Sequence, residues 1–142
     1  MDKPYHRLVI PPRIVDALLA HALAEAPREC CGVLAGPIVD GAGHVRESYP
    51  VRNDLASKTR YFTNPRDLLA VTRATALASQ EWLAIYHSHP ASPAIPSRID
   101  LAENTYGISL AHVILGLESL VPEIRAWWLH EHEFAEIELS LE

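Results

Sequence analysis

The chain of 142 residues has the usual size of one folded domain and is too short for two ordinary ones. About half of its residues are apolar (49%) and 21% are charged, which is typical of a globular protein and excludes a disordered one. Its 12 basic and 18 acidic residues give a net charge of -6, which disfavours contact with a phosphate backbone. We therefore expect one domain over residues 1–142 and no nucleic-acid partner.

Hydropathy and cysteine content indicate in which cellular compartment the protein is expected. Charged residues or prolines interrupt every apolar stretch well before the roughly 20 residues needed to span a bilayer, so no membrane partner is expected. The two cysteines, Cys30 and Cys31, are adjacent, and neighbours in sequence do not form an ordinary structural disulfide. This pattern fits a reducing compartment, and we expect a cytoplasmic protein.

Strand and helix patterns alternate along the first half of the chain. The pair Pro11-Pro12 opens a segment with apolar residues at helical spacing, and this helix is expected to end near Pro27. Asn64 before Pro65 signals the start of a second helix that reaches about residue 80. Short apolar runs predict strands over 6–10, 31–36 and 45–51, with a polar turn over 37–43.

The second half begins with an apolar run, Trp82–Tyr86, that is typical of a buried strand and that delivers His87 and His89 at its far end. A proline-rich loop over 90–96 follows, and a short helix is expected to start at Ser97. The remainder predicts three strands, over 110–115, 124–130 and 134–141. This mixed order of elements predicts an α/β or α+β fold.

The passage from His87 to Asp100 carries a metal-binding pattern. Side chains two apart in a strand point to the same face, so His87 and His89 can present both imidazoles to one point. Asp100 follows one turn into the next helix and can supply an oxygen ligand. Two histidines and a carboxylate leave a fourth position open, which is the pattern of a catalytic zinc. The alternative is that Ser97 and Asp100 only cap a helix and the histidines are polar residues at a strand end.

The order His-x-His, seven residues beginning with proline, then Ser-x-x-Asp resembles the metal signature of the JAMM, or MPN-plus, metallopeptidases. That family also places a glutamate before a Cys-Gly pair that opens a buried strand, and the run Glu29–Leu34 resembles this element. The resemblance covers about residues 8–129. It implies a JAB/MPN fold, a curved mixed sheet flanked by helices in a cytidine-deaminase-like arrangement.

The resemblance also implies a role for each site residue. His87, His89 and Asp100 would hold one Zn²⁺ per chain with a bound catalytic water. Glu29 would take a proton from that water and pass it to the leaving group, and Ser97 would steady the oxyanion, which are the tasks that a carboxylate and a hydroxyl perform in such reactions. Without the Cys-Gly pair that follows it, Glu29 would be interpreted as a solvated glutamate before a strand.

Family members cleave amide or isopeptide bonds, most often at the C-terminal tail of ubiquitin-like proteins. The compact chain is similar to small bacterial members that release an amino acid, notably cysteine, from a ubiquitin-like sulfur-carrier protein, and we expect this activity. A non-catalytic MPN-type scaffold and a cell-wall or phage-tail peptidase are the alternatives. The carrier is expected to contact a rim formed by residues 53–61 and 91–96, while the sequence is silent on the oligomeric state.

Three other features have simpler interpretations. His130 and His132 are also two apart, but no third ligand lies at a recognisable spacing, so a solvated turn is the better interpretation. Trp127 and Trp128 face opposite sides of a strand, and core packing explains at least one of them. Cys31 is interpreted as a small buried apolar residue.

Overall fold

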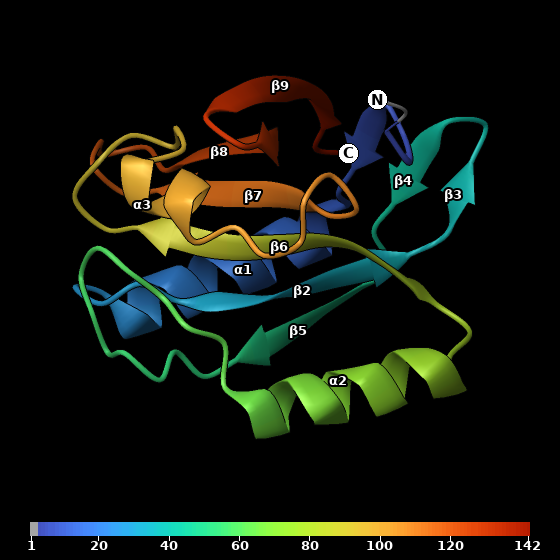
Figure 1. The fold of residues 1–142 in the computed structure, drawn as a ribbon, viewed down its shortest axis with the longest axis horizontal. Helices are drawn as coiled ribbons and strands as arrows, with labels where there is room; N and C mark the ends of the chain where they lie inside the picture. Colours follow the sequence, from blue (N-terminus) through green and yellow to red (C-terminus); the bar gives the residue numbers. More distant parts are fainter. Residues whose placement is uncertain (1–2) are drawn as a thin grey trace.

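The computed structural model describes residues 3–142 and contains three helices around one curled mixed sheet (Figure 1). No helix in that range has both the length and the apolar character needed to cross a membrane. The elements in chain order are β1 (Arg7–Val9), α1 (Pro12–Glu25), β2 (Cys31–Gly36), β3 (Ile38–Val39), β4 (Ala42–His44), β5 (Glu47–Val51), α2 (Pro65–Leu77), β6 (Glu81–His89), α3 (Arg98–Ala102), β7 (Ala111–Gly116), β8 (Glu123–His130) and β9 (Glu133–Ser140).

The nine strands of the described chain join one sheet in the order β3-β4-β1-β9-β8-β7-β6-β2-β5. β6 lies in the interior of this sheet, parallel to β7 on one side and antiparallel to β2 on the other. The β6–β7 crossover passes through α3, as a parallel connection requires. The predicted mixed α and β fold is therefore confirmed, and β6 is held on both sides along the segment that carries the histidines.

Helix α1 covers one face of the sheet (Figure 1). Ile14, Leu18 and Ala22 lie one turn apart on the same helix face, and all three are buried. They belong to a core cluster that also contains Tyr86 of β6 and Trp128 of β8. The hydroxyl of Tyr86 contacts His21 of the same helix at 2.7 Å. The apolar periodicity of α1 thus fixes which side chains of β6 face this helix.

Two smaller apolar clusters lie on the opposite face of the sheet. Val71 of α2 packs with Ile85 of β6 and with residues of β2, while Leu101 of α3 packs against Ile114 of β7 and Trp127 of β8. Figure 1 shows α3 in front of the strands that α1 covers from behind. Because side chains alternate along β6, the odd-numbered residues that follow Ile85 point to the α3 face.

The segment expected to be a polar turn over 37–43 contains a small hairpin instead. β3 and β4 pair antiparallel around Asp40 and Gly41, both of which have positive φ values (51° and 77°). An Asp-Gly pair at the centre of a two-residue loop is a strong hairpin signal because glycine tolerates this conformation. The expectation was wrong because the flanking runs are too short to show strand periodicity. β4 then pairs with β1 and extends the sheet.

We predict that Gly32→Ala destabilises the fold by about 1–3 kcal/mol, because β2 is packed too closely for a methyl group. A Cβ at this position would lie 2.3 Å from Tyr86 Cε2 and 2.5 Å from the carbonyl oxygen of Tyr49. Gly107→Ala, where the surroundings are open but φ is +59°, is the comparison and should cost only about 1 kcal/mol. Denaturant unfolding of both variants measures this order, and an equal or smaller loss at Gly32 would contradict it.

Candidate metal centre

The far end of β6 carries two buried histidines on one face of the sheet. His87 is paired with Cys31 of β2 on one side and with Ile114 of β7 on the other. His87 and His89 project together, and their Nε2 atoms are 3.2 Å apart. Because β6 is held by both neighbouring strands, the sheet itself brings the two imidazole nitrogens to one point.

Asp100 reaches the same point from α3. Ser97 caps this helix: its Oγ accepts a hydrogen bond from the Asp100 backbone N–H (3.1 Å), and Asp100 Oδ2 accepts one from the Ser97 N–H (2.9 Å). The same carboxylate faces the histidines, with Oδ1 3.3 Å from His87 Nε2 and Oδ2 3.0 Å from His89 Nε2. The capping pair is therefore present, but Asp100 also completes a three-residue cluster.

The hydrogen bond at Nδ1 of His89 indicates which kind of ligand this cluster can bind. Its Nδ1 lies 2.8 Å from the carbonyl oxygen of Pro93, which can only accept, so Nδ1 carries the proton of the neutral ring. The lone pair of Nε2 then points at the carboxylate of Asp100 and at Nε2 of His87. A single cation at this point could be bound by all three groups and would offset the charge of the carboxylate. A carbonyl-bound Nδ1 is the usual second contact of a histidine that ligates a metal. The donor set fits zinc.

Charge interactions within the cluster are strong. Burial lowers the pKa of His89, but the hydrogen bond and the charge of Asp100 outweigh burial and raise that pKa above its usual value of 6.5. Burial disfavours the charged form of Asp100, yet the charge of His87 and hydrogen bonds from both histidines hold the Asp100 pKa well below its ordinary range. Asp100 therefore favours a positive charge beside it, which is the charge that a bound cation would supply.

Glu29 lies between the end of α1 and the start of β2, and only 3% of the residue is exposed. Within residues 3–142, no group makes a hydrogen bond to its Oε1 atom. Burial raises the pKa of Glu29 to about 8, while the charge of His89 lowers it and that of Asp100 raises it. The carboxyl group is thus close enough to the cluster to respond to its charges, and its pKa is near neutrality, as suits a proton carrier.

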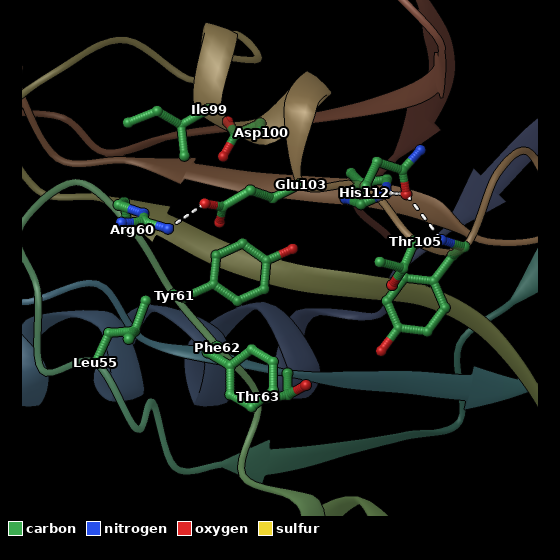
Figure 2. A pocket seen from close by; sticks show the side chains of 12 residues that line it. Leu55, Arg60, Tyr61, Phe62, Thr63, Ile99, Asp100, Glu103, Thr105 and His112 are labelled. Carbon is green, nitrogen blue, oxygen red and sulfur yellow. Dashed lines mark hydrogen bonds and ion pairs between the residues drawn. The ribbon is translucent and has the colours of Figure 1, made fainter.

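A cavity of about 380 Å³ opens beside Asp100. Figure 2 shows it between the loop that carries Leu55, Tyr61 and Phe62 and the helix that carries Ile99 and Asp100. Within the described chain, no residue of 91–96 lines this cavity, so only the 53–61 part of the expected rim borders it. Glu29 instead borders a second cavity of about 390 Å³, which includes Asn53.

Tyr61 is a member of the site that sequence reasoning did not single out. Its ring stacks on His87, with centroids 4.6 Å apart and planes 25° from parallel. Burial raises the pKa of its hydroxyl well above 10, so this group remains a hydrogen-bond donor at physiological pH. No spacing rule links residue 61 to residue 87; only the segment 53–61 had been expected near the site.

The remaining candidates behave as expected. His130 and His132 are exposed at the turn between β8 and β9, and within residues 3–142 the cluster of His87, His89 and Asp100 is the only group arranged to hold a metal. Trp127 and Trp128 are both buried, in the clusters on opposite faces of the sheet. Both cysteines are buried and free, and the Cys31 thiol lies 3.4 Å from the carbonyl oxygen of Val51.

Several known proteins are similar to this chain. A CysO-cysteine peptidase of Mycobacterium tuberculosis is 42% identical over 94 residues, which are 66% of this chain and 63% of that relative. A probable TtuB-protein conjugate cleaving protease of Thermus thermophilus is 35% identical over 130 residues, which are 89% of this chain and 80% of that protein. A solution structure of a protein from Desulfitobacterium hafniense has a TM-score of 0.88 at 27% identity and covers 95% of this chain and 92% of its own.

The family described as prokaryotic homologs of the JAB domain matches residues 11–130. This range contains the cluster, Glu29 and Ser97, together with every element from α1 to β8. The chain therefore belongs to the family of prokaryotic homologs of the JAB domain.

Proposed function

We propose that this chain is a zinc-dependent peptidase that hydrolyses an amide bond at the C-terminal tail of a ubiquitin-like protein, with one catalytic domain over residues 1–142. The observation that carries the proposal is the convergence of His87, His89 and Asp100 on one buried point. Beside it lies a buried glutamate whose Oε1 has no hydrogen-bond partner among residues 3–142. Two imidazoles and one carboxylate that leave a position open are the donor set of hydrolytic zinc.

In this proposal each residue has a separate task. Zinc held at the cluster would act as a Lewis acid toward the scissile carbonyl and would favour the ionised forms of water and of Glu29. Glu29 accepts the proton of the attacking water at its free Oε1 and donates it to the nitrogen of the leaving group. Ser97 Oγ already accepts a hydrogen bond from Asp100 N, so its own proton is free to steady the oxyanion.

The substrate class rests on the relatives. One is named a CysO-cysteine peptidase and another a probable TtuB-protein conjugate cleaving protease, so we propose a sulfur-carrier or other ubiquitin-like tail as the substrate. The proposed leaving group is an amino acid such as cysteine. The cavity beside Asp100 has the size of a small-ligand pocket and is lined by Tyr61, Phe62 and Tyr106, which supports a place there for a residue next to the scissile bond.

We predict that Glu29→Gln lowers kcat/KM by about 100-fold or more, because the amide keeps the size of the side chain but cannot carry the proton. Glu47→Gln, an exposed change at the start of β5, is the matched control and should retain wild-type activity. Intact mass spectrometry of a ubiquitin-like carrier with one extra C-terminal residue measures the loss of that residue. Equal activity of Glu29→Gln and wild type would refute the role of Glu29. If zinc-loaded wild type leaves every such carrier intact, the alternative of a non-catalytic MPN-type scaffold would be favoured.

Zinc affinity should fall as the pH drops through the raised pKa of His89. The proton that Asp100 stabilises on Nε2 must leave before that nitrogen can bind a cation, so binding is strongest above this pKa and weakens by about tenfold per pH unit below it. Competition with a zinc-chelating dye at pH 7.5 and pH 5.5, corrected for the dye's own protonation, measures the change. An affinity that does not vary with pH would contradict the assignment of His89 as a ligand.

A further inference from the structure

The side chain of Asn53 makes four hydrogen bonds, all to backbone atoms. Its Nδ2 donates to the carbonyl oxygens of Glu29 (3.1 Å) and Arg60 (3.0 Å), and its Oδ1 accepts from the N–H groups of Leu55 (3.0 Å) and Phe62 (3.0 Å). Two carbonyls on one side and two N–H groups on the other fix the orientation of the amide, because a flipped amide would lose every bond. Asn53 therefore joins Glu29 to both ends of one loop.

This loop, residues 53–63, is closed by a bridge between Asn53 and Thr63. It holds the backbone of Glu29 from two sides, since the Glu29 N–H donates to the carbonyl oxygen of Ser57 at 2.7 Å while the Glu29 carbonyl accepts from Asn53. In the described part of the chain, no group makes a hydrogen bond to Oε1 of the Glu29 carboxylate. Its position therefore depends on how firmly its backbone is held.

The same loop reaches the other parts of the site. Tyr61 stacks on His87. Arg60 forms an ion pair with Glu103, the C-cap residue that follows α3 (Figure 2). Leu55 and Phe62, whose N–H groups bind Asn53, line the cavity beside Asp100. One loop thus connects the backbone of the proton carrier, a metal-ligating histidine and the wall of the cavity.

We propose that Asn53 is a positioning residue for Glu29: it sets the place of the Glu29 backbone, and through it the carboxylate, relative to His87 and Asp100. The inference rests on the proposed function, because it assigns Asn53 to the reaction in which Glu29 carries the proton. The Nδ2 bond to Glu29 serves the base, whereas the two Oδ1 bonds serve the loop alone.

Asn53→Asp tests the donor side of this amide. Aspartate keeps an oxygen for the N–H groups of Leu55 and Phe62, but it loses the donor to the carbonyl oxygens of Glu29 and Arg60 and places a carboxylate against them. The matched control is Gln80→Glu, which also turns an amide into a carboxylate, lies after α2 and away from this loop, and keeps the oxygen that accepts from the Tyr49 hydroxyl at 3.1 Å. Asn53→Ser is a second variant that also removes the Glu29 contact, in case Asn53→Asp does not fold.

We expect kcat of Asn53→Asp to fall by about tenfold or more, with KM and zinc content unchanged, because a misplaced base slows the chemical step without weakening binding. Gln80→Glu should stay within about twofold of wild type. A purely structural loss would lower zinc content or raise KM as well. If zinc-loaded Asn53→Asp keeps kcat within about twofold of wild type, Asn53 does not position Glu29.

Amide hydrogen exchange tests the inference independently of activity. In the zinc-loaded protein, the Glu29 amide, which is bonded to Ser57, should exchange at least about fivefold faster in Asn53→Asp than in wild type or Gln80→Glu, while the amides of β2 should not change. If wild type cleaves no carrier but the Glu29 amide is loosened as expected, the proposed function fails and the positioning by Asn53 stands. An unchanged Glu29 amide would overturn the inference whether or not the protein cleaves a carrier.

Discussion

Two imidazole nitrogens and a carboxylate face one another at a buried point, and much of the surrounding fold holds them there. The Nε2 atoms of His87 and His89 are 3.2 Å apart and lie 3.3 and 3.0 Å from the carboxylate oxygens of Asp100. Such an arrangement is unfavourable unless a proton or a cation lies between the groups. The sheet holds β6 on both sides and the capping box holds Asp100, so the groups cannot separate to relieve the conflict.

A second constraint concerns Glu29, the proposed proton carrier beside this point. Glu29 is buried, which raises its pKa, and its Oε1 has no partner in the described chain. A fully bonded carboxylate would be better placed but less able to exchange a proton. The fold holds Glu29 by its backbone through Ser57 and Asn53, which leaves the carboxylate available. Position and reactivity are thus supplied by different parts of the same residue.

Sequence reasoning succeeded where the chemistry lies in local spacing. The two histidines at a strand end, the cap at Ser97 and the helical periodicity of α1 follow from periods of 2 and 3.6 residues, and all three lie where they were expected. The likeness to the JAMM signature was confirmed by the family match. The missed hairpin shows the limit of periodicity, because β3 and β4 are too short to display it. The Asp-Gly pair at 40–41 was nevertheless a signal for a hairpin turn.

Contacts across long stretches of sequence could not be predicted in the same way. Tyr61 stacks on a residue 26 positions further along the chain, and Asn53 bonds to Glu29 across 24 positions. Neither residue has a local pattern that sets it apart from an ordinary loop residue. Their roles become visible only when the curl of the sheet brings the 53–63 loop against β6 and α3, since tertiary packing rather than local preference decides such contacts.

Anomalous diffraction at the zinc absorption edge, from crystals of the zinc-loaded protein, tests the central claim most directly. The account predicts one strong anomalous peak per chain, bounded by Nε2 of His87, Nε2 of His89 and the carboxylate of Asp100, at the distances of about 2.0–2.2 Å that zinc makes with nitrogen and oxygen ligands. A protein that holds no zinc, or holds it only at another place such as the exposed pair His130 and His132, would contradict the account.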